Sequence, residues 1–277
     1  MCWARRPWDA SPFETANLYR IIMVPPDRAL EINCEAWNCI APLFRGRDAL
    51  PAYGPLASTE DELRLLSDIS ISRVLELGCG SGHSLAYLAE RGADELWGID
   101  FSSTQIALAE ETLQSVADKT RLLKSPMEQN PGVPENYFDL VFSIYGIGWS
   151  TDLAATMALV TRYLKPGGCF IASGEHPVYS CLEWNGAQYV MAKPYSSEGP
   201  QEHQAWNGVP IVIQRRTLAT FVEQIVHAGP HVEALIETSL KEVPPTADKM
   251  DPSRWYSIPR ASIMPTTLIV KATKSSR

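Results

Sequence analysis

A glycine-rich segment between a short apolar strand and a helix constrains this chain more than any other feature. The segment reads Glu76-Leu77-Gly78-Cys79-Gly80-Ser81-Gly82 and lies between a strand expected at 73–77 and a helix expected at 85–91. Glycines in that context allow a tight turn and let a ligand approach the main chain. Asp100 ends the next expected strand, where a carboxylate can accept hydrogen bonds from both hydroxyls of an adenosine ribose. We therefore expect a nucleoside site at the carboxyl ends of these strands.

The rest of the sequence alternates short apolar runs with amphipathic stretches. Helices are expected at 102–115, 152–164 and 218–226, the first of them opened by a capping box at Ser102. Strands are expected at 73–77, 95–100, 121–124, 138–145, 169–173, 232–238 and 266–272. This alternation predicts an α/β protein with a doubly wound, mostly parallel, seven-stranded sheet that carries helices on both faces.

Two segments interrupt this alternation. Residues 1–65 are rich in proline and are predicted to form an N-terminal helical preface, with its best helix at 27–41, ahead of a main domain at 66–277. Residues 175–215 form a long insert that is poor in charge and rich in aromatic side chains, and a second irregular stretch follows at 244–259. Long excursions of this kind are usually functional. We expect the insert to cover the substrate, and we expect its residues Trp184, Tyr189 and Trp206 to shield the substrate from solvent.

The composition favours some partners over others. The chain has 277 residues and a formal net charge of −8, so no nucleic-acid partner is expected. No apolar run approaches the ~18 residues of a membrane span, and no secretory signal is expected at the N-terminus. The six cysteines include no C-x-x-C pair. That pattern predicts reduced thiols, no metal site and a cytoplasmic location.

Two ligands compete for the glycine-rich segment. The dinucleotide fingerprint G-x-G-x-x-G would need a third glycine where His83 stands. The carboxylate of Glu76 would also repel a pyrophosphate. The same carboxylate suits S-adenosylmethionine (SAM), which carries a sulfonium and an α-ammonium and has no phosphate. SAM is therefore the favoured ligand, and a nicotinamide dinucleotide is the disfavoured alternative.

Four motifs in order resemble the class I SAM-dependent methyltransferases, in particular the group that shares the methyltransferase type 11 pattern. They are the segment 76–82, Asp100, the strand residues 138–143 and the turn 164–168, and the resemblance covers about residues 70–175. It implies a Rossmann-like fold, SAM as methyl donor and S-adenosylhomocysteine (SAH) as product.

The resemblance also assigns residues to the cofactor. Glu76, Gly78 and Gly80 would face the methionine end of SAM. Asp100 would hold the ribose, and Phe101 would lie beside the adenine.

Three further residues follow from the same resemblance. Met127 would contact the adenine edge, although the loop 124–128 lacks the acid that many relatives have there. Ser143 and Tyr145, at the end of the fourth strand, would reach the methionine end and the methyl group, and Tyr145 is a catalytic candidate.

Methyl transfer needs alignment of three atoms and a general base only where the acceptor must lose a proton. The best candidate for that base is His176, which follows the fifth strand. Glu175 and Tyr179 are weaker candidates.

The aromatic insert favours a small, aromatic or hydrophobic molecule as methyl acceptor. A methyltransferase acting on RNA or protein, and a non-catalytic SAM-binding protein, remain as alternatives. The sequence leaves open the acceptor atom (oxygen, nitrogen, sulfur or carbon) and the oligomeric state.

Overall fold

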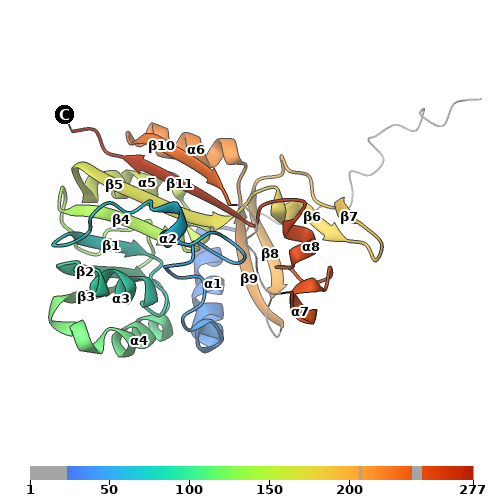
Figure 1. Ribbon diagram of the computed structural model, residues 1–277, viewed down its shortest axis with the longest axis horizontal. Helices are drawn as coiled ribbons and strands as arrows, with labels where there is room; N and C mark the ends of the chain where they lie inside the picture. The colour runs from blue at the N-terminus through green and yellow to red at the C-terminus, as the bar shows by residue number, and fades with distance from the viewer. Residues whose placement is uncertain (1–23, 206–207, 239–244, 277) are drawn as a thin grey trace, which may run out of the picture.

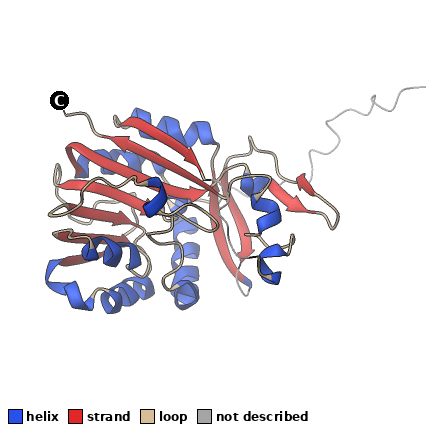
Figure 2. Cartoon of the chain, viewed as in Figure 1, coloured by secondary structure: helices blue, strands red, loops and turns tan. Residues whose placement is uncertain are grey.

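The computed structural model describes residues 24–205, 208–238 and 245–276. Its centre is a seven-stranded sheet in the order β10-β11-β5-β4-β1-β2-β3 (Figures 1 and 2). Strands β1 to β5 run parallel, and β11 lies antiparallel between β5 and β10. The strands are β1 (Arg73–Leu77), β2 (Glu95–Asp100), β3 (Thr120–Lys124), β4 (Phe138–Ile144), β5 (Leu164–Glu175), β10 (His231–Glu237) and β11 (Thr267–Thr273). The predicted fold class is confirmed.

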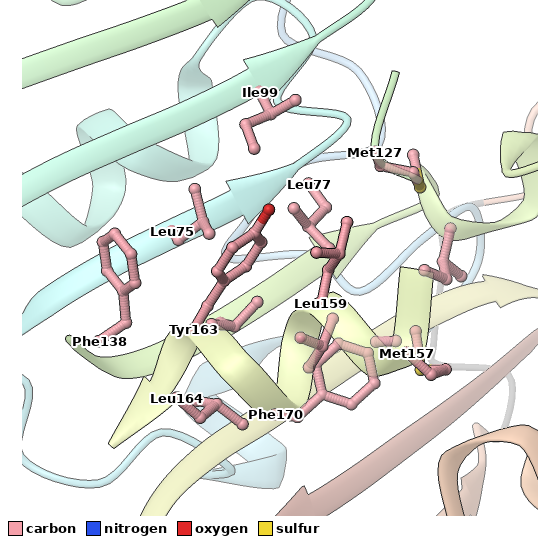
Figure 3. Packing of buried hydrophobic residues seen from close by; sticks show 14 of the residues in the cluster. Leu75, Leu77, Ile99, Met127, Phe138, Met157, Leu159, Tyr163, Leu164 and Phe170 are labelled. Carbon is pink, nitrogen blue, oxygen red and sulfur yellow. The ribbon is translucent and has the colours of Figure 1, made fainter. Parts of the chain in front are cut away.

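The strands alternate side chains between two hydrophobic layers, because successive residues point to opposite faces of a sheet. Leu75 and Leu77 of β1 pack on one face (Figure 3), against helices α5 (Leu153–Tyr163) and α6 (Leu218–His227). Val74 packs on the other face, against α3 (His83–Glu90) and the segment around α4 (Ser103–Thr112). The sheet is thus buried on both faces, as expected for parallel strands of nearly continuous apolar sequence.

Strand order reverses at β1, which lies between β4 and β2. Glu76 pairs with Phe142 of β4 on one side and with Gly98 of β2 on the other. The crevice outside the carboxyl ends of such neighbouring strands is where open α/β sheets bind ligands. The predicted cofactor residues therefore meet at one edge of the sheet.

The preface and the connections contribute short elements. Helix α1 (Pro26–Ile40) packs against strand β9 of the insert and against α4. The residues of the preface before Val24 lie outside the described part of the chain. Other helices within the described ranges are η1 (Ala41–Phe44), α2 (Glu60–Leu63), η2 (Gln114–Lys119), η3 (Ile147–Trp149), η4 (Tyr179–Cys181), α7 (Ala247–Met250) and α8 (Ile258–Ala261).

The insert is more regular than its glycine and proline content indicates. It contains two antiparallel hairpins, which form two sheets separate from the central one. Their strands are β6 (Leu182–Trp184), β7 (Tyr189–Met191), β8 (Gly199–Ala205) and β9 (Val209–Arg215). Ile211 and Val212 of β9 are both buried, so the strand is covered on both faces at these residues.

The turn predicted at 165–168 is also part of a strand. β5 begins at Leu164, and the main chain of Gly167 and Gly168 exchanges hydrogen bonds with Lys274. A register shift between Phe138 and Leu140 of β4 accommodates these residues.

Within the described residues, no helix combines the length and apolar character needed to cross a membrane.

Candidate cofactor and acceptor site

The glycine-rich loop joins β1 to α3 through left-handed backbone. Gly78, Gly80 and Gly82 have φ of 69°, 50° and 77°, a region that L side chains rarely adopt. A Cβ built on Gly78 would lie 3.0 Å from the Cα of Gly146. A Cβ built on Gly80 would have no neighbour nearer than the Gln105 side chain, at 3.9 Å. The loop is therefore tightly packed at Gly78 and leaves room beside the main chain of Gly80 for a ligand.

Asp100 is held in place by main-chain donors from two loops. Its Oδ2 accepts the N–H of Gly80 at 3.0 Å, and its Oδ1 accepts the N–H of Ser102 at 2.8 Å. Burial raises the pKa of Asp100 to about 6, although these two hydrogen bonds act to lower it. Each carboxylate oxygen retains further acceptor capacity, which suits the two hydroxyls of a ribose.

Glu76 is a second buried carboxylate, with its side chain against Ser84. Burial raises its pKa well above the usual value, and the nearby charge of Asp100 adds to the effect. Its Oε2 has no hydrogen-bond partner among the described residues, which is uncommon for a buried polar atom. An α-ammonium group would supply both the donor and the positive charge that this oxygen favours. The residues present therefore fit SAM.

Helix α1 forms the outer wall of the predicted adenosine side. Asn38 accepts the Ser102 hydroxyl at 2.8 Å, and the Cys34 thiol donates to the main-chain oxygen of Phe101 at 3.4 Å. These contacts tie α1 to the loop that follows Asp100. A shallow pocket of about 350 Å³ opens here, lined by Leu30, Glu31, Cys34, Glu35, Phe101 and Pro126.

Met127 and Ser143 support the glycine-rich loop from inside the protein. Met127 is buried in the cluster of Figure 3, and its methyl group would lie 3.5 Å from a Cβ on Gly78. The Ser143 hydroxyl is fully buried and donates to the main-chain oxygen of Leu77 at 2.6 Å. Direct contact of either side chain with SAM stays a prediction.

Tyr145 lies where the loop after β4 meets the preface. Its φ of 55° is unusual for a residue with a side chain. Its hydroxyl lies 2.6 Å from Oγ1 of Thr267, so the side chain reaches toward the start of β11. Gly54 passes so close that a Cβ there would lie 2.2 Å from the tyrosine ring. Because the next residue, Gly146, adjoins Gly78, Tyr145 stands beside the part of the loop that is predicted to face the methionine end of SAM.

A carboxylate surrounded by aromatic rings lies next to Tyr145. Glu175, the last residue of β5, accepts the Tyr256 hydroxyl at 2.9 Å and the indole N–H of Trp255. Tyr179 stacks on Tyr256 with ring centroids 6.0 Å apart, and the charge of Glu175 and the Tyr256 side chain both act on the pKa of Tyr145. Burial raises the pKa of Glu175 itself. We call Tyr145, Glu175, Tyr179, Trp255 and Tyr256 the Glu175 cluster.

His176 is placed in structural contacts. It is buried, its Nδ1 accepts the N–H of Val178 at 3.2 Å, and its Nε2 lies 2.9 Å from Oε1 of Glu237. The main-chain N–H of His176 donates to the main-chain oxygen of Thr266. Both ring nitrogens are thus engaged: Nε2 joins the end of β5 to β10, and Nδ1 holds the loop that follows His176. The role of His176 as a base stays a prediction, and the geometry favours Glu175 over it.

Of the three aromatic residues predicted to shield the substrate, the structure describes Trp184 and Tyr189. Trp184 and Tyr189 pack edge to face with centroids 5.2 Å apart, and the Tyr189 hydroxyl donates to the main-chain oxygen of Pro252 at 2.8 Å. They connect the β6–β7 hairpin to the segment that carries Trp255. Trp206 lies outside the described residues. Sequence analysis missed Trp255 and Tyr256 as site residues, although their aromatic density in the irregular stretch 244–259 was a signal.

Three comparisons bear on these observations. Residues 75–172 match the family model described as a methyltransferase domain. A Haemophilus influenzae protein of uncharacterised function is 28% identical over 76% of this chain and 85% of its own length. A sterol 24-C-methyltransferase of Pneumocystis carinii is 26% identical over 66% of this chain, which spans 44% of that protein's length. The crystal structure of a SAM-dependent methyltransferase from Mesorhizobium loti has a TM-score of 0.62 and 24% identity, covering 76% of this chain and 94% of that one.

The seven-stranded, mostly parallel sheet matches the Rossmann-like fold of the methyltransferase structures it resembles, and the glycine-rich loop and Asp100 lie at its switch point. Residues 75–172 carry a methyltransferase domain, and the enzyme is of the SAM-dependent methyltransferase type with SAM as its cofactor.

Proposed function

We propose that this enzyme transfers the methyl group of SAM to a small, largely apolar molecule bound at the Glu175 cluster. The observation that carries the proposal is the position of this cluster. Tyr145 leads directly into Gly146, which packs on Gly78, and Glu175 lies within electrostatic range of Tyr145. An apolar site with a few converging polar groups is the usual form of a small-molecule site.

The chemistry asks little of the protein beyond alignment and exclusion of water. Bound SAM supplies a methyl carbon already activated by its sulfonium. Held by Glu76, the main chain of Gly80 and Asp100, SAM would give up this carbon to the acceptor atom as the carbon–sulfur bond breaks, and the electron pair would stay on the sulfur of SAH. A proton on the acceptor passes to Glu175, because burial raises the pKa of this carboxyl and makes its anion more basic.

Several features support a small acceptor. Aromatic side chains dominate the surroundings of Glu175, because Tyr179, Trp255 and Tyr256 pack at the end of β5 and Tyr189 bonds to Pro252 beside them. We assign residues 1–65 and 175–215 as covers of the cofactor and the acceptor. The acidic net charge of −8 favours a small molecule over a nucleic acid. The similarity to a sterol methyltransferase is consistent with an apolar acceptor.

Incubation with SAM that carries a deuterated methyl group tests the proposal. The enzyme is given pooled small alcohols, amines, thiols and carboxylic acids, and products are identified by mass spectrometry. We expect a labelled small molecule, and we expect Glu175→Gln to lower kcat by about 100-fold or more without changing SAH affinity.

The matched control is Glu223→Gln on α6, an exposed glutamate far from the cluster, which should leave kcat unchanged. Label that appears only in RNA or protein added to the same mixture would overturn the small-molecule proposal. An unchanged kcat in Glu175→Gln would remove Glu175 from the reaction.

A further inference from the structure

Arg215, the last residue of β9, is a buried arginine with a hydrogen-bond donor that has no partner among the described residues. Only 9% of its surface is exposed. Its Nη2 donates to Sγ of Cys181 at 2.9 Å, whereas its Nη1 is buried with no hydrogen-bond partner. It forms no ion pair with a carboxylate in the described ranges of the chain. A buried charge is costly unless it is paired, so an unpaired guanidinium in the interior marks a site for an anion.

Arg260 shows what a buried arginine with a structural role looks like in the same region. Its guanidinium donates to the main-chain oxygens of Tyr179, Leu182 and Trp255, and it lies between two aromatic rings. Carbonyl dipoles and ring faces surround its charge, although its Nε is buried without a hydrogen-bond partner among the described residues. Arg215 has one thiol as its hydrogen-bond partner in the part of the chain described.

Two more basic side chains share this neighbourhood. The main-chain N–H of Lys193 donates to the oxygen of Cys181 at 3.3 Å, the residue whose thiol Arg215 contacts. His203 of β8 is half-buried. Burial lowers the pKa of His203, and the positive charges of Lys193 and Arg215 lower it further. Lys193 forms an ion pair with Glu183 of β6, whose Oε1 lies 3.6 Å from the Lys193 ammonium. We call Lys193, His203 and Arg215 the basic cluster.

The basic cluster borders the Glu175 cluster through Trp255. The indole N–H of Trp255 donates to Glu175, and the Lys193 ammonium lies 5.8 Å from the centroid of the same ring. The charge of Lys193 also acts to lower the pKa of Glu175. On the other side, Arg216 follows Arg215 and donates to the main-chain oxygen of Ser150, in the loop after β4. Trp255 and Lys193 therefore connect the two clusters.

We propose that Arg215, assisted by Lys193 and His203, binds an oxyanion group of the methyl acceptor, so that the acceptor is an acidic small molecule. This inference rests on the proposed function: the Glu175 cluster receives the reacting end and the basic cluster receives the anionic end. A guanidinium presents two parallel N–H donors that match a carboxylate or a phosphate, whereas an ammonium or an imidazolium adds charge without that geometry.

Binding of three flat probes to the SAH-saturated enzyme tests the inference by isothermal titration calorimetry. Benzoate carries a carboxylate, phenyl phosphate carries a phosphate, and benzamide is the neutral isostere of benzoate. We expect at least one anion to bind about tenfold or more tightly than benzamide. The tighter of the two anions identifies the oxyanion as carboxylate or phosphate. Equal binding of all three probes, or no binding of either anion, overturns the inference.

Variants assign the preference to Arg215. Arg215→Met should abolish it and Arg215→Lys should retain part of it. The control Arg254→Met removes an exposed arginine that pairs with Asp248 and should retain all of it. A preference that persists in Arg215→Met refutes the role of Arg215, and SAH titration of each variant verifies that the cofactor site is folded. Should Arg215→Met lose SAH binding, Arg215→Lys and the wild-type comparison with benzamide decide the question alone.

The inference and the proposed function fail in different ways. Labelled product from neutral acceptors, formed equally by wild type and Arg215→Met, overturns the anion site and leaves the small-molecule methyltransferase intact. Anion binding that depends on Arg215, with labelled methyl found only on RNA or protein, overturns the proposed acceptor and shows that the site serves another ligand.

Discussion

Replacing Glu76 by glutamine should affect the cofactor-free and cofactor-bound enzyme in opposite directions. Glu76 is 2% exposed, burial raises its pKa well above the usual value, and its Oε2 has no partner among the described residues. Glutamine keeps the shape of the side chain and its contact with Ser84 but removes the charge. The cofactor-free variant should therefore be as stable as the wild type or more stable, since a buried unpaired carboxylate is costly.

The expected loss of SAH affinity follows from the charged hydrogen bond that the substitution removes, between the Glu76 carboxylate and the α-ammonium group. A hydrogen bond to a charged group contributes about 1.5–3 kcal/mol. Since about 1.4 kcal/mol corresponds to a tenfold change in affinity, SAH should bind the Glu76→Gln variant about 10- to 150-fold more weakly.

Calorimetric titration of SAH and thermal unfolding of the cofactor-free protein measure the two effects on the same samples. Glu90→Gln, an exposed glutamate at the end of α3, is the matched control and should change neither quantity. A Glu76→Gln variant that is less stable without cofactor yet binds SAH within about threefold of wild type would show that Glu76 is structural, and the assignment of the methionine end would be wrong.

Three further variants test other parts of the site. Because the pKa of Asp100 rises from 3.8 to about 6 on folding, the cofactor-free wild type should lose stability as pH rises from about 4 to about 6. SAH affinity should rise over the same pH range. The Asp100→Asn variant should show neither pH trend, as measured by unfolding and by SAH titration at several pH values. His176→Gln should reduce the free energy of unfolding by about 1–3 kcal/mol and leave kcat within about threefold; a kcat loss of about 100-fold at unchanged stability would restore His176 as the base. Gly82→Ala should cost about 1–3 kcal/mol in denaturant unfolding, because its φ is 77° and a Cβ would lie 3.0 Å from Leu113. Gly186→Ala, at φ 98° with open space around it, should cost less, and equal costs would show that packing at Gly82 is unimportant.

The sheet was predictable because its strands are apolar runs of the right length. β1 and β2 have the predicted bounds, since Val74, Leu75, Leu96 and Ile99 are buried whichever face they point to. The hairpins of the insert were not predictable in the same way. Glycine and proline around β8 and β9 are typical of loops, and only pairing between the two strands turns these residues into a sheet.

The meeting of Glu76, Gly80 and Asp100 was predictable for a related reason: they lie at or just after the ends of neighbouring strands, and parallel strands bring their carboxyl ends to one edge. The contacts around the proposed acceptor site were not predictable. His176 stands in the expected loop, but its partner Glu237 is distant in sequence. Trp255 reaches Glu175 across 80 residues. Spacing along the chain carries no information about contacts of that kind.

Titration of the wild-type enzyme with SAH, and in parallel with NADH, tests the central claim most directly. The account predicts saturable SAH binding at one site, weakened by Asp100→Asn, and no uptake of NADH. Binding of NADH with no response to SAH or SAM would contradict it, because the carboxylates of Glu76 and Asp100 would then not be serving a cationic adenosyl donor.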